Sequence, residues 1–224
     1  MFLSCFHLIC ISLKISFTGS IATGKDIRAH ASLKRITLEM GGNDAAICLD
    51  DANPAEIAPK ILHAAMMNSG QVCIAVKRCY VPRNRHDEYI DEFKKAASGL
   101  TVGNGFNKGT TMGPINNKMQ FDRICDLVVD AKKNGATIEH GGKPIEDTDG
   151  YFFPPTIVSN VSSKHRIVAE EQFGPVLPII PYDSEEDAIK EANGTAFGLG
   201  GSVWGEEGHA ASVARHIGMS SFQK

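Results

Sequence analysis

The sequence contains no block of basic residues, no long hydrophobic run and no repeat or low-complexity segment. Its 23 lysine and arginine residues are nearly balanced by 26 aspartate and glutamate residues, for a net charge of −3. This balance excludes the basic surface of a nucleic-acid-binding protein and a polybasic membrane patch. The apolar run at residues 1–15 is interrupted and shorter than the about 20 residues that cross a membrane. We therefore expect a small molecule as the partner, with no nucleic acid and no membrane.

Metal-binding and disulfide-forming patterns are also missing. The six cysteines include no CxxC motif and no cysteine–histidine pair at the spacing of a metal site. We therefore expect no metal, reduced thiols and a cytoplasmic protein. Residues 1–16 have neither the basic start nor the small-residue cleavage site of a signal peptide, which stays open as an alternative. We interpret this atypical segment as lying outside any folded domain.

The composition is that of a globular protein. Over 224 residues, 42% are apolar and 22% are charged, which is enough apolar material for a sizeable core. Short apolar runs alternate with helical patterns, which predicts an α/β fold with an open, largely parallel sheet and helices on both faces. Strands are predicted at residues 35–40, 45–49, 78–81, 136–139, 176–182 and 200–204. Helices are predicted at residues 54–70, 87–100, 118–134, 184–193 and 207–217.

A glycine-rich segment at residues 19–26, GSIATGKD, has the glycine and lysine spacing of a phosphate-binding P-loop. Asp26 stands where such a loop needs a serine or threonine to bind magnesium. A nucleotide-binding P-loop is therefore an unfavoured alternative, which ATP binding and a Lys25→Ala variant would test. A turn at Gly19 and Ser20 that opens a helix could still contact an anion through free N–H groups. No GxGxxG motif is present.

Two residues have the local setting of catalytic groups. Glu39 ends an apolar strand and precedes two glycines, where open α/β sheets place functional residues, although an exposed strand end would look the same. Cys73 follows a helix in a glycine-containing loop, where a thiol can act as a nucleophile. A buried, inert cysteine is the alternative for Cys73. It is also our interpretation for three others, Cys48, Cys79 and Cys125.

A further segment, EEQFGP at residues 170–175, places acidic residues and Phe173 at a break before a predicted strand. The alternative interpretation is a polar turn with Phe173 packed inside. The eight histidines form no spaced metal pair and no catalytic triad, so we expect them to have structural or surface positions.

Five segments combine into a pattern that is more specific than any one of them. They are FTGSIATGK, LEMGGNDA, NSGQVC, GNGFNKGTTMGP and EEQFGPVLP, which begin at Phe17, Leu38, Asn68, Gly103 and Glu170. In this order, and with this spacing of Glu39 from Cys73, they resemble the aldehyde dehydrogenase superfamily. The resemblance implies a catalytic domain at residues 43–224 and a remnant of a Rossmann-like dinucleotide-binding domain at residues 17–42.

The resemblance also implies a reaction, the oxidation of an aldehyde to a carboxylic acid with NAD or NADP. Cys73 would attack the aldehyde carbon, and the thiohemiacetal would give its hydride to the cofactor and leave a thioester. Glu39 would activate the water that hydrolyses this thioester, which favours hydrolysis over transfer to coenzyme A. The backbone N–H of Cys73 would stabilise the oxygen anion.

A cofactor site is implied in the same way. Gly19 and Ser20 would approach the cofactor, and Gly41 would line the nicotinamide site. Glu171 would hold the nicotinamide ribose, and Phe173 would pack against the cofactor.

The sequence departs from the family in length at both ends. In the family, a part that precedes Phe17 supplies the contacts to adenosine and an asparagine of the oxyanion hole, and a tail pairs subunits into homo-oligomers. Neither is recognisable here, so we expect a folded catalytic domain that binds NAD weakly or not at all, which calorimetric titration would test. An inactive chain that acts only by subunit association is the alternative to an active enzyme. The aldehyde and the choice between NAD and NADP stay open.

Overall fold

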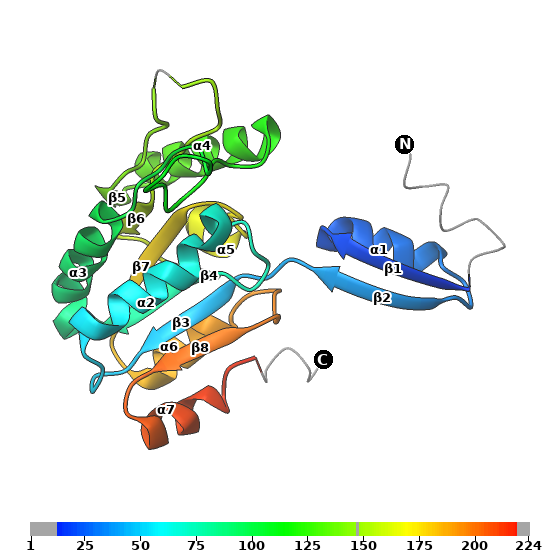
Figure 1. The fold of residues 1–224 in the computed structure, drawn as a ribbon. Coiled ribbons are helices and arrows are strands. Elements are labelled where there is room, and N and C mark those ends of the chain that lie inside the picture. Colours follow the sequence, from blue (N-terminus) through cyan, green and yellow to red (C-terminus); the bar gives the residue numbers. More distant parts are fainter. Residues whose placement is uncertain (1–12, 147, 219–224) are drawn as a thin grey trace. The chain divides into compact units, whose positions relative to one another are not determined.

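The computed structural model describes residues 13–146 and 148–218. The chain divides into two compact units, Met1–Gly41 and Gly42–Lys224, whose helices and strands are labelled in Figure 1. The division falls between the two glycines of the LEMGG segment, one residue before the predicted start of the catalytic domain at Asn43. Residues 1–12, which make up most of the predicted amino-terminal segment, lie outside the described residues.

The first unit is a β-α-β arrangement. Strands β1 (Lys14–Gly19) and β2 (Arg35–Met40) pair in parallel, and helix α1 (Ile21–His30) connects them. The prediction that residues 1–16 belong to no folded domain is therefore wrong for residues 14–16. In β1, half-buried Ile15 and Phe17 alternate with exposed neighbours, a period of two that is typical of a strand. This period was overlooked because residues 1–16 were interpreted as one segment outside any folded domain.

Helix α1 decides the structure of the glycine-rich segment. Ser20 is the N-cap of α1, and its Oγ accepts the Thr23 N–H at 3.2 Å. The helix begins directly after Ser20, so Gly24 and Lys25 lie inside it and not in a loop that could surround a phosphate. The P-loop alternative is therefore wrong. Gly24 allows α1 to pack closely on β2, because a Cβ there would collide with the Met40 side chain.

The second unit is built on a six-stranded sheet in the order β5-β6-β7-β4-β3-β8. The strands are β3 (Asp44–Cys48), β4 (Val76–Pro82), β5 (Thr137–His140), β6 (Thr156–Ser159), β7 (Val176–Tyr182) and β8 (Gly201–Trp204). Neighbouring strands are parallel except β5 and β6, which are antiparallel. Every residue of β3 and β4 is buried, as expected for inner strands of a sheet that is covered on both faces.

Helices cover both faces of this sheet (Figure 1). Helices α2 (Pro54–Met66) and α3 (His86–Ser98) share one apolar core with Ala46 and Cys48 of β3. Helices α4 (Lys118–Lys133), α6 (Glu185–Asn193) and α7 (Glu207–Ala214) share the other core with Ala45 and Ile47. The short helix α5 (Arg166–Ala169) lies beside α4. This arrangement confirms the predicted α/β fold class.

Local sequence signals account for most element boundaries in this unit. Asn53 caps α2, and its Oδ1 accepts the Ala55 N–H at 3.2 Å. The strand predicted at residues 176–182 has the observed bounds of β7. The helix predicted to reach residue 70 ends as an α-helix at Met66, and the 3-10 turn η2 (Met67–Gly70) follows. A second 3-10 turn, η3 (Arg83–Arg85), precedes α3. Strand β6 and helix α5, each of four residues, were not predicted.

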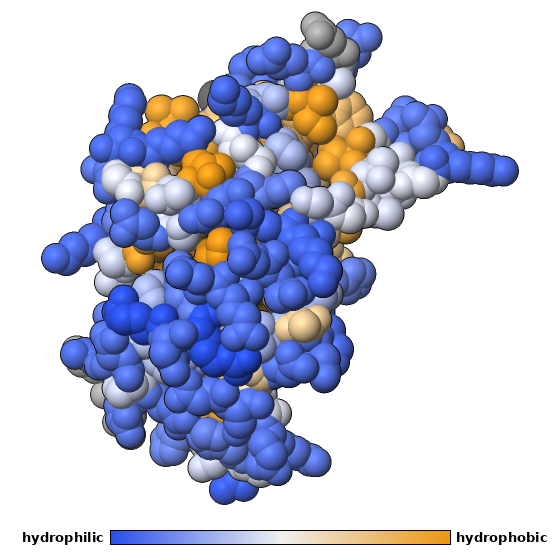
Figure 2. All heavy atoms as spheres, turned by 90° about the vertical axis from the view of Figure 1, so that its left-hand side faces the viewer, coloured by the Kyte–Doolittle hydropathy of each residue, from blue (hydrophilic) through white to orange (hydrophobic). Residues whose placement is uncertain are grey.

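The face of the molecule drawn in Figure 2 is mostly hydrophilic, with apolar side chains in small groups between polar ones. Within the part of the chain that the structure describes, no helix is both long and apolar enough to cross a membrane. The large exposed apolar side chains include Ile74, which is 64% exposed and directly follows Cys73.

Candidate active site

Three of the predicted segments meet at the amino ends of the strands in the second unit, an edge that we call the amino edge. Gly42 lies before β3, Cys73 lies before β4, and residues 171–173 lie before β7. Because β7, β4 and β3 are parallel neighbours, the loops that precede them lie at one edge. The Gly42 N–H donates to Glu171 Oε1 at 3.1 Å, and a Cβ on Gly42 would lie 2.8 Å from the Cys73 carbonyl oxygen. The loops are therefore in direct contact.

A tight turn positions the loop that carries Cys73. Asn68 and Ser69 have φ angles of 50° and 57°, and Gly70 has a φ of 73°, so three successive residues adopt the left-handed conformation that side chains rarely allow. A Cβ on Gly70 would collide with the backbone of Gly174. Glycine at position 70 therefore lets the NSGQVC segment pack directly against the EEQFGP segment.

Polar side chains tie the same turn to the GTTMGP segment. Ser69 Oγ donates to the Gly113 carbonyl at 2.8 Å. Gln71 Oε1 accepts the Asn116 N–H at 2.7 Å, and Gln71 Nε2 donates to the Asn68 carbonyl at 3.0 Å. Ser69 and Gln71 therefore join the turn to Gly113 in the GTTMGP segment and to Asn116 just after it.

The described cysteines differ in accessibility. Cys73 is exposed, Cys125 is half-buried, and Cys48 and Cys79 are buried with their Sγ atoms 4.0 Å apart. Burial raises the pKa of the Cys79 thiol well above its usual value, and it also raises the pKa of the Cys125 thiol. Because the thiolate is the reactive form, Cys79 and Cys125 are poor nucleophiles at neutral pH. Cys73 is the only described cysteine that is both exposed and placed at the amino edge.

Lys77 lies beneath the cysteine loop and was not predicted as a site residue. Its side chain is 2% exposed, and its Nζ donates to the carbonyl oxygens of Val72, Cys73 and Ala75 at 2.8, 3.3 and 3.1 Å. Burial lowers the pKa of Lys77, and the negative charges of Glu171 and other neighbouring groups oppose this effect. The available signal in the sequence was the pair Lys77 and Arg78 inside an otherwise apolar strand, VKRCYV.

The two adjacent glutamates of EEQFGP have different environments. Glu170 pairs with Arg166 at 2.7 Å and Arg123 at 3.0 Å, and the Arg166 hydrogen bond lowers the pKa of the Glu170 carboxyl. Glu171 is half-buried at the amino edge, where burial raises the pKa of its carboxyl although the Gly42 N–H and Lys77 oppose the shift. Glu170 therefore joins helices, whereas Glu171 faces the loop of Gly42.

Phe173 has an unusual backbone conformation. Its φ of 52° lies in the left-handed region, which a bulky residue adopts only when its surroundings enforce it. Gln120 Nε2 donates to the carbonyls of Gln172 at 2.7 Å and Phe173 at 2.9 Å, and buried Gln172 donates to the Lys77 carbonyl at 3.2 Å. These bonds hold the segment against α4 and β4, and Phe173 is half-buried.

The remaining predicted residues, Gly19, Ser20, Glu39 and Gly41, belong to the first unit. Thr18 pairs in register with Glu39, and Gly19 pairs with Met40, so Gly19 and Glu39 lie at the carboxyl ends of β1 and β2. Ser20 follows at the start of α1, and the Glu39 side chain is exposed. Within this unit the structure therefore brings these predicted residues to one edge, whereas Cys73, Glu171 and Phe173 belong to the other unit.

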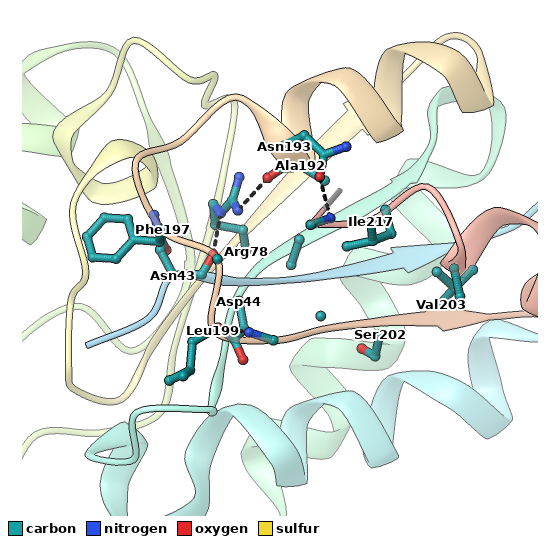
Figure 3. A pocket seen from close by; sticks show the side chains of 16 residues that line it. Asn43, Asp44, Arg78, Ala192, Asn193, Phe197, Leu199, Ser202, Val203 and Ile217 are labelled. Carbon is teal, nitrogen blue, oxygen red and sulfur yellow. Dashed lines mark hydrogen bonds between the residues drawn. The ribbon is translucent and has the colours of Figure 1, made fainter. Parts of the chain in front are cut away.

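A cavity of about 490 Å³ lies beside β3 and β8 in the second unit (Figure 3). Asn43, Asp44 and Phe197 line it, and Arg78 donates to the Asn43 carbonyl at 2.9 Å and to the Ala192 carbonyl at 2.9 Å. Burial raises the pKa of the Asp44 carboxyl. Cys73 does not line this cavity, so we place the candidate site at the amino edge and not here.

Sequence comparisons place these segments among known proteins. Residues 12–223 match the model of the aldehyde dehydrogenase family. A mitochondrial succinate-semialdehyde dehydrogenase of Rattus norvegicus is 41% identical over 197 residues, which are 87% of this chain and 38% of that protein. A betaine aldehyde dehydrogenase of Bacillus subtilis is 41% identical over 198 residues, which are 86% of this chain and 40% of that protein. The chain spans about two fifths of the length of these relatives.

Solved structures give a similar result. A crystal structure of a mutant aldehyde dehydrogenase C from Pseudomonas syringae, in complex with NAD+ and octanal, aligns with a TM-score of 0.89 and 38% identity. The alignment covers 92% of this chain and 43% of the Pseudomonas syringae chain. An aldehyde dehydrogenase of Mycobacterium tuberculosis in complex with NAD+ aligns with a TM-score of 0.88 and 37% identity, with coverage of 92% and 43%.

Proposed function

This chain belongs to the aldehyde dehydrogenase family, and from this premise we propose that the protein oxidises an aldehyde to a carboxylic acid with Cys73 as the nucleophile. The position of Cys73 is the observation that carries the proposal. It is an exposed thiol in a loop that is fixed against the Glu171 loop at the amino edge. The complex of one relative with NAD+ and octanal supports a nicotinamide cofactor and an aliphatic aldehyde as ligands.

In the first step, the Cys73 thiolate forms a bond to the aldehyde carbon, and the π electron pair of the carbonyl moves to its oxygen. Among the described residues, the Cys73 backbone N–H has no hydrogen-bond acceptor, so it is available to this oxygen anion. An N–H that needs no reorientation stabilises the developing charge at no further cost, which supports a role for this loop in the reaction.

A bound nicotinamide cofactor would supply the acceptor for the hydride of the substrate carbon, and Cys73 would then carry a thioester. Glu171 fits such a cofactor because Oε1 accepts the Gly42 N–H while Oε2 has no partner among the described residues. Glu171 Oε2 can therefore accept a hydrogen bond from a hydroxyl group of the cofactor ribose. In this proposal half-buried Phe173 contacts the cofactor, and Gly19, Ser20 and Gly41 allow its close approach.

Glu39 completes the reaction in this proposal. Its carboxylate removes a proton from water, the water oxygen bonds to the thioester carbon, and the Cys73 thiolate leaves. The exposed position of Glu39 at the carboxyl end of β2 supports this assignment, because open α/β sheets bind ligands at such ends.

We also propose a reducing compartment such as the cytoplasm, which the four described free thiols, Cys48, Cys73, Cys79 and Cys125, support.

The test is formation of NADH or NADPH by the purified protein with a panel of aldehydes that includes octanal. We expect Cys73→Ala to reduce the rate by more than about a thousandfold, because the variant lacks the nucleophile of the proposed covalent intermediate. Cys125→Ala is the matched control and should retain the rate, since Cys125 lies in helix α4. Reduced cofactor formed equally well by Cys73→Ala would contradict the mechanism. No turnover by the unaltered protein would favour a non-catalytic role in subunit association.

A further inference from the structure

The buried Lys77 fixes the direction of several carbonyl groups in the cysteine loop. Its Nζ donates to the carbonyls of Val72, Cys73 and Ala75 at 2.8, 3.3 and 3.1 Å. An ammonium group has three N–H donors and no acceptor, so these three bonds use its full capacity. No hydrogen of the ammonium is therefore left for a ligand, and its whole effect is exerted through the loop backbone.

The directions of these carbonyl groups also fix the directions of the N–H groups that follow them in the chain. In a planar trans peptide, a carbonyl and the N–H of the next residue point in opposite directions. Because the Val72 carbonyl points toward Lys77, the Cys73 N–H points away from it. The Cys73 carbonyl also points toward Lys77, so the Ile74 N–H points away from Lys77 in the same way. Among the described residues, neither N–H has an acceptor, and the side chains of Cys73 and Ile74 are both exposed.

Two carboxyl groups face the Lys77 ammonium. One is Glu171, in the loop before β7, and the other is Asp44, which is not in a loop but is the first residue of strand β3. Their negative charges, and that of a Cys73 thiolate, favour the protonated form of Lys77 and so oppose the effect of burial. The neighbouring Arg78 points its guanidinium to the Asn43 and Ala192 carbonyls and not to the cysteine loop.

We propose that Lys77 is a positioning residue for the reaction: by holding the carbonyls of the cysteine loop, it presents the N–H groups of Cys73 and Ile74 together to the substrate oxygen anion. This inference rests on the proposed function of Cys73. It adds a second backbone donor, from Ile74, to the site, and it assigns the orientation of both donors to one buried side chain. In general, N–H groups that point toward a sulfur favour its charged form, so the reactivity of a thiol reports on the direction of such donors.

The experiment measures alkylation of Cys73 by iodoacetamide as a function of pH, with each cysteine followed separately by peptide mass spectrometry. We compare the unaltered protein with Lys77→Met, which has a similar length and no charge. We expect alkylation of Cys73 at pH 7 to be about tenfold slower in Lys77→Met, because the N–H groups of the loop are then no longer held in this direction. At high pH, where the thiol is fully ionised, the two rates should converge.

Two controls separate positioning from loss of structure. Lys60→Met removes the same charge from the exposed face of α2 and should leave the profile unchanged. The buried Cys48 and Cys79 report on the fold, because general loosening would accelerate their alkylation. If Lys77→Met does not fold, Lys77→Gln takes its place, since a neutral amide still donates to a carbonyl. Lys77→Gln should show an intermediate profile.

The outcomes distinguish this inference from the proposed function. Identical Cys73 profiles in the unaltered protein and a folded Lys77 variant would overturn the role of Lys77 and leave the nucleophile assignment intact. Faster alkylation of Cys48 and Cys79 with an unchanged Cys73 midpoint would also overturn it. Cys73 alkylation no faster than that of Cys125 in the unaltered protein would instead argue against the proposed function.

Discussion

In the unit that ends at Gly41, the candidate residues Gly19 and Glu39 lie at the carboxyl ends of strands, whereas in the unit that begins at Gly42 the candidate residues precede their strands. The first position is the usual ligand-binding edge of an open α/β sheet. The second depends on contacts between loops, such as the Gly42 N–H with Glu171 at 3.1 Å. The same chain therefore uses two different ways of presenting functional groups.

The two units also differ in how their strands are buried. Strand β2 has a mixed pattern of exposed and half-buried residues, whereas every residue of β3 is buried. A two-stranded sheet with one helix buries little apolar surface and is marginally stable, while six strands between two helical layers form a substantial core. We expect the second unit to hold Cys73 on the more stable part of the chain, and the first to hold Glu39 on the less stable part.

The largest expected effect comes from matched truncations in the two cores. Ile61 in α2 is 0% exposed and Ile27 in α1 is 4% exposed. Ile61→Ala should lower the free energy of unfolding of the second unit by about 2–5 kcal/mol, because it removes apolar contacts and leaves a cavity. Ile27→Ala should destabilise the first unit only. Hydrogen exchange by mass spectrometry on peptides from each unit measures both, and equal destabilisation of the second unit by the two variants would contradict the division.

A smaller loss is expected at the turn that positions Cys73. Gly70→Ala forces a side chain into a left-handed conformation and against the Gly174 backbone. We expect a loss of about 3 kcal/mol in the free energy of unfolding of the second unit, measured in urea. Gly109→Ala is the matched control, because its φ is 87° but no atom lies within 4 Å of the new Cβ. Its cost should be about 1 kcal/mol, and similar losses at both positions would show that the contact with Gly174 is unimportant.

The smallest effect is a pH dependence that is confined to the second unit. His209 contacts Asp51 at 2.8 Å and Glu185 at 2.9 Å, and these partners, Asp51 first, raise the pKa of His209 above its usual 6.5. A raised pKa means that the folded state binds the proton more tightly than the unfolded state. The stabilisation is therefore complete below pH 6.5 and is lost as the pH rises through the folded-state pKa.

The measurement for this prediction is the urea midpoint of the second unit from pH 6 to pH 9. His209→Gln should flatten the decrease with rising pH, because glutamine cannot be protonated. The effect is modest, since the ion pairs are exposed to solvent. An unchanged pH dependence in the variant would assign it to other groups.

Much of the second unit was predictable because its signals are local. The apolar run of β7 and the Asn53 cap of α2 are readable in a few residues, and the predicted fold class and family are both confirmed. Strand β6 was missed because four residues contain too little of a period to recognise. Residues 14–16 were missed because they continue the apolar amino-terminal segment, and their partner strand, β2, lies about twenty positions further along the chain. The catalytic and cofactor-binding roles of Cys73, Glu39 and the other site residues stay predictions.

The sequence by itself determined the α/β fold, the family and the choice of Cys73 as the candidate nucleophile, because each depends on residue type, order and short-range period. Only the tertiary structure decided which groups surround that thiol. The burial of Lys77 follows from the inner position of β4 in the sheet, and the contact of Gly70 with Gly174 joins segments that are far apart in the chain. Such contacts arise when parallel strands bring distant loops to one edge, and no local pattern encodes which loops will meet.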